Sequence, residues 1–418
     1  MVQAPQPVDV SDIDLSDLRF WGRPPGERYE AFARLRRRGP VFFAEAGWGP
    51  IPPGPGYWAL TRHADVVEAS RTPAVFASEP SAISVPDLPR DFNEFFGSMI
   101  SMDDPRHARM RRIVSRGFTP RMLGKLDDDI NRTAARIVDG LLDAGPCDFV
   151  STVSARLPLT IICEMMGIPR DQHRTVFESS NVVLAGADPD YLGEDADTAL
   201  HQLLTAGGNL AALLAELAED RRSAPRDDLT SALVNADVDG EALTGQEIGS
   251  FFILLAVAGN ETTRNAITHA LDLLTRHPDQ RELWWSDFEA HAGTAVEEVV
   301  RHASPVVWMR RTLTEDHEMN GHRYRAGDKV LLYYASANRD ETVFADPDRF
   351  DVTRSPNPHV GFGGPGPHFC LGAHLARREI TAILRELHRR VPTIHATAPP
   401  RRLLSNFVNG VKELPCAF

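Results

Sequence analysis

The sequence contains few cysteines and no long apolar run. Four cysteines are spread over 418 residues, at Cys147, Cys163, Cys370 and Cys416. So few cannot build the disulfide framework of a small secreted protein, and they favour a reducing, cytoplasmic environment. The longest apolar run, FFILLAVAG at 251–259, is too short for a bilayer-spanning helix of ~20 residues. The N-terminus lacks a signal-peptide pattern. We therefore expect a cytoplasmic protein that does not span a membrane.

Positive charge is also in deficit. Lysine and arginine number 45 against 58 aspartates and glutamates, which gives a net charge of -13 at pH 7. This acidic balance argues against nucleic acid or an anionic membrane as the main partner. The hydrophobic content of 42% is that of a globular protein, and no internal repeat or linker divides the chain. We expect a loosely ordered arm over residues 1–20 and a single domain over residues 21–418.

The hydrophobic pattern predicts a mainly helical fold with small sheets. Expected helices cover residues 157–169, 207–222, 243–278 and 371–388. The third is the longest. It should begin with a capping box formed by Thr244 and Glu247, and it is apolar nearly all round at its centre, so we expect it to cross the core. Expected strands form two hairpins, one from 41–46 and 57–60 and one within 322–336, turned near Ala326 and Gly327.

The segment GFGGPGPHFCLG at residues 361–372 presents one thiol in a stiff, glycine-rich loop. Cys370 stands at the start of an expected helix, where free N–H groups and the helix dipole favour a thiolate. The glycines let the backbone come close to something flat or bulky, and Phe362 adds an aromatic plane. A thiolate cradled by N–H groups suits an iron ligand.

Two other interpretations of this segment remain. Cys370 could be a buried structural thiol, the commoner fate of a lone cysteine. Alternatively, His368, Cys370 and His374 could bind zinc. The chain lacks the paired cysteine spacings of ordinary zinc sites, which disfavours the zinc interpretation.

A second motif, AGNETT at residues 258–263, lies in the middle of the longest expected helix. The hydroxyl of Thr262 can reach the carbonyl of Ala258 four residues earlier and loosen the helix there. Gly259 makes room for a ligand. Glu261 is an acid in an apolar stretch, which is unfavourable unless its carboxylate is hydrogen-bonded or used.

Two further pairs share a helix face by spacing alone. Glu298 and Arg301 are three residues apart and can form an ion pair. His107 and Arg111 are four apart in DDPRHARMRR and can act together. Without context, each pair would be an ordinary solvated surface feature.

These motifs together resemble the cytochrome P-450 family of haem-thiolate monooxygenases, over nearly the whole chain from about residue 12. The resemblance implies the family's mainly helical fold with small sheets around a buried haem b (iron protoporphyrin IX). It also implies that Cys370 is the proximal ligand of the iron and that dioxygen is a co-substrate. One departure is visible. In many members the phenylalanine lies seven residues before the cysteine, whereas Phe362 lies eight residues before Cys370.

The resemblance also implies roles for the other motif residues. Thr262 would steady dioxygen, and Glu261 would help to relay protons to it. His107, Arg111, Arg311 and His368 would bind the haem propionates. Further haem contacts are implied for Ala258, Gly259, Phe362 and Gly372. Arg349, in ADPDRF, would join Glu298 and Arg301 in a structural cluster on the proximal side of the haem.

The resemblance narrows to one actinobacterial group through FFGSMISMDDPRHARMRR, ICEMMGIP, FFILLAVAGNETTRNAITH, ASPVVWMRRT and LLSNFVNGVKELP. Members of this group oxidise the terminal methyl groups of methyl-branched fatty acids, isoprenoids and sterol side chains. Alignment to the family motifs implies a set of substrate contacts with apolar side chains, for each of which core packing is an equal alternative. The set is Phe95, Phe96, Met99, Leu254, Val257, Val306, Val307, Phe407 and Val408.

The implied activity is insertion of one oxygen atom from dioxygen into an unactivated C–H bond of an apolar lipid. Electrons would come from a ferredoxin and an NAD(P)H-dependent ferredoxin reductase, and the enzyme would act as a monomer. Three alternatives remain: a tailoring hydroxylase of a polyketide or macrolide, a peroxide-driven enzyme of the same fold, and a haem- or lipid-binding protein without catalysis.

Overall fold

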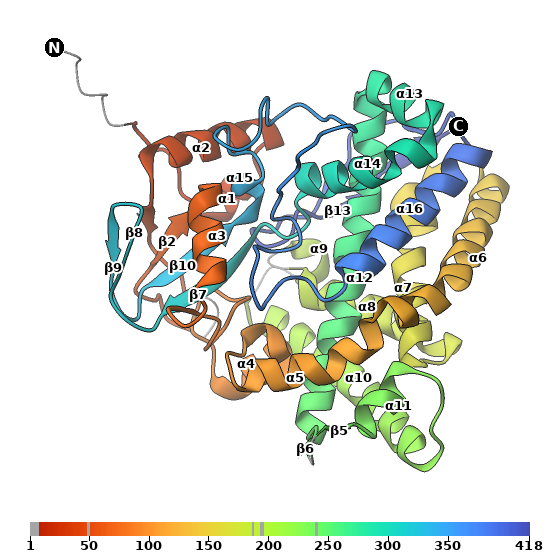
Figure 1. The fold of residues 1–418 in the computed structure, drawn as a ribbon, viewed down its shortest axis with the longest axis horizontal. Coiled ribbons are helices and arrows are strands. Elements are labelled where there is room, and N and C mark those ends of the chain that lie inside the picture. The colour runs from red at the N-terminus through yellow and green to blue at the C-terminus, as the bar shows by residue number, and fades with distance from the viewer. Residues whose placement is uncertain (1–7, 48–50, 186–187, 193–195, 239–240) are drawn as a thin grey trace.

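The computed structural model describes residues 8–47, 51–185, 188–192, 196–238 and 241–418. Figure 1 shows a sheet with N-terminal helices beside a larger helical body. This arrangement confirms the mainly helical fold with small sheets. Within the described ranges, no helix has both the length and the apolar composition needed to cross a membrane.

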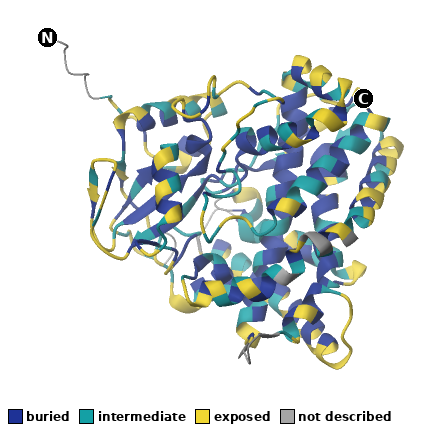
Figure 2. Cartoon of the chain, viewed as in Figure 1, coloured by how far each residue is buried: buried dark blue, intermediate teal, exposed yellow. Residues whose placement is uncertain are grey.

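The helical body is built around α12 (Gly245–Arg276), which has 32 residues. It contains α6 (Pro120–Ala144), α7 (Arg156–Met166), α8 (His173–Leu184), α9 (Pro189–Leu192), α10 (Ala196–Ser223), α11 (Leu229–Val234), α13 (Pro278–Ser286), α14 (Phe288–Ala303) and α16 (Ala373–Arg390). The expected capping box is present: the N–H of Glu247 donates to the Thr244 hydroxyl (3.1 Å), and the N–H of Thr244 donates to the Glu247 carboxylate (2.9 Å). Most of α12 is buried, so it crosses the core as predicted (Figure 2).

The largest sheet has the strand order β1-β2-β10-β7-β3. Its strands are β1 (Val41–Phe43), β2 (Tyr57–Leu60), β3 (Phe76–Ala77), β7 (Trp308–Leu313) and β10 (Lys329–Tyr333). Side chains of β10 alternate between two core clusters. Leu331 and Tyr333 pack with residues of α2 (Pro25–Arg38), and Val330 and Leu332 pack with residues of α3 (His63–Arg71). This sheet is therefore covered on both faces.

The remaining strands form small sheets around the body. The strands β4 (Cys147–Asp148), β14 (Pro415–Ala417) and β11 (His395–Ala396) form one sheet in the order β11-β14-β4. Three pairs complete the set: β5 (Asp237–Val238) with β6 (Glu241–Ala242), β8 (His317–Met319) with β9 (His322–Tyr324), and β12 (Arg401–Arg402) with β13 (Val411–Glu413).

The first expected hairpin is confirmed, and the second is wrong. Strands β1 and β2 pair antiparallel, as predicted. Residues 322–336 turn at Gly327, where φ is 85°, but β9 and β10 do not pair with each other. Both edges of β10 are taken by β2 and β7, so β9 pairs with β8 instead.

The N-terminal segment was predicted to be a loosely ordered arm over residues 1–20. Residues 1–7 lie outside the described residues. Beyond them, Ile13, Leu15 and Phe20 are buried in the core cluster that covers one face of the sheet. The division into an arm and a single domain over 21–418 stays a prediction.

Candidate active site

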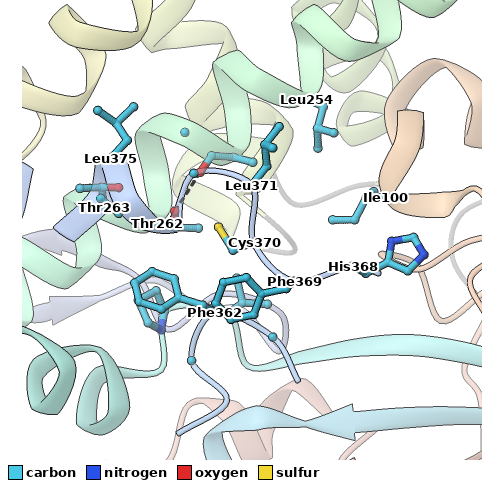
Figure 3. Close-up of a pocket in the computed structure, with 18 of the residues that line it drawn as sticks. Ile100, Leu254, Thr262, Thr263, Phe362, His368, Phe369, Cys370, Leu371 and Leu375 are labelled. Carbon is cyan, nitrogen blue, oxygen red and sulfur yellow. Dashed lines mark hydrogen bonds between the residues drawn. The ribbon is translucent and has the colours of Figure 1, made fainter. Parts of the chain in front are cut away.

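A cavity of about 1410 Å³, counting its mouth, lies where α12 faces the loop before α16. We call residues 361–372 the cysteine loop. Figure 3 shows the Cys370 sulfur directed into this cavity, with Ile100, Leu254 and His368 also on its wall. The cavity therefore joins the two principal sequence motifs, which are about a hundred residues apart in the chain.

One face of α12 supplies a wall of the cavity. Leu254, Ala258 and Thr262 are spaced by four residues and are only partly buried, whereas the residues between them are mostly buried. This spacing places them on one helix face. The Thr262 hydroxyl donates to the Ala258 carbonyl at 2.8 Å, which confirms the predicted hydrogen bond. Gly259 also lines the cavity.

Glu261 is buried on another face of α12 and does not line the cavity. Its carboxylate accepts hydrogen bonds from the Arg264 guanidinium and from the Asn265 amide, the latter at 3.0 Å. Adjacent residues on an α-helix point about a quarter-turn apart, which separates Glu261 from Thr262. In this conformation the Glu261 carboxylate points away from the cavity that Thr262 lines.

The cysteine loop directs Cys370 toward the cavity. Burial raises the pKa of the Cys370 thiol, and N–H groups of Gly372 and Ala373 and the charges of Arg111 and Arg377 lower it. Burial outweighs these groups, and the pKa of the thiol lies above its ordinary value. The N–H groups at the N-terminus of α16 therefore only partly offset burial, and the thiolate expected from the sequence stays a prediction. The residue is exposed only in the sense that it faces the cavity.

Two glycines explain why the loop can lie directly against α3. A Cβ at Gly364 or Gly366 would come within 2.3 Å of Ser70, to its hydroxyl oxygen and its carbonyl oxygen respectively. The extra residue between Phe362 and Cys370 is accommodated within this turn, because the Cys370 N–H still donates to the Phe362 carbonyl at 2.9 Å. The Phe362 ring lines the cavity and lies 4.3 Å from the Arg377 guanidinium carbon.

Four basic side chains predicted to act together do gather at one edge of the cavity. Arg111 of α5 (Arg106–Val114) and Arg311 of β7 line it, as does His368. The His107 ring lies against the His368 ring, with centroids 4.1 Å apart. The neighbouring Arg310 points the opposite way, because side chains alternate along a strand, and its guanidinium bonds to Asp87 at 2.6 Å.

These basic groups have little protein counter-charge. The Arg111 guanidinium donates to the Phe369 carbonyl (2.6 Å) and that of Arg311 to the Arg310 carbonyl (2.7 Å), and neither pairs with a carboxylate among the described residues. Nε2 of His107 is buried and has no hydrogen-bond partner among those residues. Such a cluster is energetically incomplete and suits a ligand that carries carboxylates.

The pKa values agree with this interpretation. Burial, and then repulsion from the Arg311, His107 and Arg111 charges, lowers the pKa of His368 to about 2. Burial is also the main cause that lowers the pKa of Arg111 and of Arg311. Each lowered pKa means that the surrounding protein disfavours the positively charged form of the side chain. A bound anionic group at this edge of the cavity would offset that effect. A flat cofactor with an iron and two carboxylates, such as haem, fits both the thiol and the basic edge.

The Glu298 cluster holds the segment that leads into the cysteine loop. Glu298 and Arg301 are fully buried and share two bonds of 2.7 Å. Arg301 also donates to the Asn338 carbonyl (2.7 Å), and the Asn338 amide oxygen accepts from the Val360 N–H (2.7 Å). Val360 immediately precedes the loop, so the cluster sets the position of the loop's first residue.

The predicted third member of this cluster is corrected. Arg349 is exposed and contributes only its carbonyl, which accepts from Arg301 at 3.1 Å. The guanidinium of Arg354 takes the predicted place, 3.1 Å and 3.2 Å from the two carboxylate oxygens of Glu298. A turn at Asp351, whose N–H also bonds to Glu298 (3.0 Å), brings Arg354 back to α14, whereas Arg349 precedes that turn.

The predicted substrate contacts divide into two groups. Met99, Leu254 and Val306 line the cavity. The other six lie outside the lining of this cavity, and their assignment as substrate contacts stays a prediction: Phe95, Phe96, Val257, Val307, Phe407 and Val408. Helix and strand geometry is the reason that they lie outside it. Val257 is on a buried face of α12, and Val307 alternates with Val306 and packs into the core cluster with α2.

The cavity also has a lining residue that the sequence interpretation missed. Glu379 of α16 is buried and lines the cavity, and burial raises its pKa to about 8. The side chain therefore carries a proton at neutral pH. Its sequence signal was present: Glu379 falls on the same apolar helix face as Leu375, Ala376 and Ile383, where an unpaired acid is unexpected.

Comparison with known proteins gives the family. The model of the family described as Cytochrome P450, written here cytochrome P-450, matches residues 293–405. A methyl-branched lipid omega-hydroxylase of Mycobacterium tuberculosis (strain ATCC 25618 / H37Rv) is 51% identical, over 98% of this chain and 96% of that protein. A steroid C26-monooxygenase of Mycolicibacterium smegmatis is 40% identical, over 98% of this chain and 94% of that protein.

A solved structure is similar over the same extent. A Mycobacterium marinum cytochrome P-450 in complex with pseudoionone superposes with a TM-score of 0.93 at 43% identity, covering 99% of this chain and 100% of that one. The fold, the thiol at the cavity and these relatives lead to one conclusion: the chain belongs to the cytochrome P-450 family of haem-thiolate monooxygenases.

Proposed function

We propose that Cys370 is the proximal ligand of a haem b, and that His107, Arg111, Arg311 and His368 bind its propionates. The support is the pairing of one N–H-cradled thiol with a basic edge short of counter-charge. When bound through a thiolate, haem supplies the chemistry that activates dioxygen for insertion into a C–H bond. Ala258, Gly259, Phe362 and Gly372 all line the cavity and would contact the flat faces of the cofactor.

Thr262 is proposed to be the group that delivers a proton inside the cavity. Its hydroxyl is oriented by the Ala258 carbonyl and can exchange that acceptor for another one within the cavity. Glu261 would renew this proton. To do so its carboxylate must leave Arg264 and Asn265, so we expect a rotamer change of Glu261 to accompany proton delivery.

The substrate is proposed to be an apolar lipid that is hydroxylated at its terminal methyl group, and a methyl-branched fatty acid in particular. The observation that carries this proposal is the set of apolar side chains that line the cavity, namely Met99, Ile100, Phe251, Leu254 and Val306. Such a lining suits a hydrocarbon end, because burying apolar surface is favourable and burying an unpaired polar group is not. The 51% identity to a methyl-branched lipid omega-hydroxylase supports the same substrate class.

Bacterial members of the family receive electrons from redox partner proteins. We propose a ferredoxin and an NAD(P)H-dependent ferredoxin reductase for this chain, acting on a monomeric, cytoplasmic enzyme. The test is reconstitution with purified ferredoxin and reductase, followed by measurement of NAD(P)H oxidation that depends on a lipid substrate. Turnover with peroxide but none with the reconstituted partners would favour the peroxide-driven alternative.

A binding titration tests the substrate class. The haem would report substrate binding through a change in its absorbance. We expect methyl-branched fatty acids to bind more tightly than straight-chain acids of equal length, and cholestenone to bind as a weaker competitor. A response to macrolides with none to any lipid would instead support the tailoring-hydroxylase alternative. Binding of lipid without turnover in the reconstituted system would support a non-catalytic binding protein.

A further inference from the structure

Two cysteines that the active site does not use lie side by side on neighbouring strands. Cys147 is on β4 and Cys416 is on β14, and the two are direct partners in the antiparallel register. Their sulfur atoms are 3.9 Å apart, although the residues are 269 positions apart in the sequence. Neither residue lines the cavity around Cys370.

The backbone here already has the geometry that a disulfide requires. Residues opposite each other in an antiparallel pair have Cα atoms about 4.5 to 5.5 Å apart, which is within the range found for disulfides. A disulfide has a sulfur–sulfur bond of about 2 Å, so the sulfurs must approach by roughly 2 Å. Rotation of the two side chains about their Cα–Cβ bonds can supply that movement.

Two hydrogen bonds keep this strand pair in register. The Phe149 N–H donates to the Leu414 carbonyl at 2.9 Å, and the Leu414 N–H donates to the Asp148 carboxylate at 2.8 Å. Both bonds lie on one side of the cysteine pair, just after Cys147 on β4 and just before Cys416 on β14. The sulfurs therefore face each other as a consequence of the sheet and not of a chance side-chain orientation.

We propose that Cys147 and Cys416 are a modification site, at which a small-molecule disulfide converts the two thiols into a reversible intramolecular disulfide. The Cys147 thiolate attacks the small disulfide, one small thiol leaves, and a mixed disulfide forms. The Cys416 sulfur then attacks the Cys147 sulfur, loses its proton to solvent, and releases the second small thiol. Two protein thiols are oxidised and one small disulfide is reduced to two thiols.

The order of the two steps follows from exposure. Cys147 is partly exposed, whereas Cys416 is buried, so the small disulfide reaches Cys147 first. Burial, and then the neighbouring Cys147, raises the pKa of Cys416 to about 12, which makes the internal step the slower one. Of the other two thiols, Cys163 is buried in the main core, and Cys370, at the cavity, would be held by the haem in the holoenzyme.

The bond would close a very large loop of chain. That loop contains Thr262 and Cys370 together with α7 to α16, so the link would fasten the C-terminal strand to the segment between α6 and α7. Cross-links that close long loops restrict the unfolded chain most. We expect the oxidised protein to retain its haem to a higher temperature, with no change in the cavity.

The experiment equilibrates the folded holoenzyme with mixtures of reduced and oxidised glutathione. Free thiols are then alkylated, and peptides are identified by mass spectrometry. We expect one cross-linked peptide pair containing Cys147 and Cys416, two fewer alkylated thiols, and full reversal by dithiothreitol. The thermal midpoint of the oxidised protein should rise by about 3 °C.

Cys147→Ser and Cys416→Ser are the matched variants, and each should abolish both the cross-link and the oxidation-dependent shift. Cys147→Ser, at the more exposed position, keeps the test available if Cys416→Ser does not fold. The proposal is overturned if glutathione remains on Cys147 as a stable mixed disulfide, or if the cross-link forms only in denaturant. It is also overturned if oxidised and reduced wild-type protein have the same thermal midpoint despite the cross-link.

Discussion

Replacing Arg354 should destabilise the protein strongly, whereas replacing Arg349 should not. The two arginines are five residues apart, and the sequence motif pointed to Arg349. Arg354 is 10% exposed, and its guanidinium bonds to both oxygens of the fully buried Glu298. It also donates to the carbonyls of Ala345 (2.8 Å) and Asp346 (3.2 Å). The substitutions Arg354→Ala and Arg349→Ala therefore form a matched pair.

The expected magnitude follows from what remains after each change. In Arg354→Ala, Glu298 keeps its two bonds to Arg301. The decrease in the free energy of unfolding should therefore be smaller than for a buried charge left without any partner. Losing the charge-assisted bonds and the carbonyl contacts should lower the free energy of unfolding by about 3 kcal/mol. In Arg349→Ala, the carbonyl that Arg301 uses is retained and the exposed side chain is lost, which should change stability by less than about 0.5 kcal/mol.

Urea unfolding of the two holoenzymes measures this difference. Tryptophan fluorescence reports the fold, and haem absorbance reports the position of the cysteine loop, which the cluster holds through Asn338 and Val360. Arg354→Lys should fall between wild type and Arg354→Ala, because it keeps the charge without the planar fork. Equal urea midpoints for Arg349→Ala and Arg354→Ala would refute the assignment of Arg354 to the cluster.

Three further outcomes are expected. Glu379→Gln should raise the free energy of unfolding by about 4 kcal/mol at pH 8 and leave it nearly unchanged at pH 4. The folded-state pKa of Glu379 is about 8, above its ordinary 4.5, so its protonated form stabilises the folded state at low pH. This contribution is lost as the pH rises through about 8. A difference in urea stability between the variant and wild type that does not change with pH would contradict this. Thr262→Ala should reduce the product formed per NAD(P)H at least tenfold while Thr262→Ser retains it, and equal coupling ratios in both would count against Thr262 as proton donor. Leu254→Phe should weaken lipid binding about tenfold, since overpacking typically costs 1–3 kcal/mol, whereas Leu283→Phe on the exposed surface should bind normally; equal affinities would remove Leu254 from the lipid site.

The sequence predicted the chemistry of the site better than it predicted the shape of the cavity. Glycine spacing and a helix start pointed to Cys370 as a candidate ligand, and the resemblance to the family implied its role, whereas the Thr262 bond to Ala258 follows from helix geometry alone. The role of Arg349 could not be decided locally, because the turn that brings Arg354 to Glu298 is a tertiary feature. Glu379 was missed although it interrupts an apolar helix face.

Apolar side chains gave the least information. Val306 and Val307 are adjacent and chemically identical, yet one lines the cavity and the other packs into the core with α2. Which face of an element meets a cavity depends on how elements pack, and no local pattern records it. The wrong hairpin has the same origin, because β10 pairs with the distant strand β2 in place of its neighbour β9.

Product analysis tests the central claim most directly. The holoenzyme, with ferredoxin, reductase and NAD(P)H, is given a methyl-branched fatty acid, and the position of the new hydroxyl group is determined by mass spectrometry. The protein must first show the far red-shifted Soret band of a reduced, CO-bound haem-thiolate. The account predicts hydroxylation at the terminal methyl group. Hydroxylation only within the chain, or no product from protein that shows the band, would contradict it.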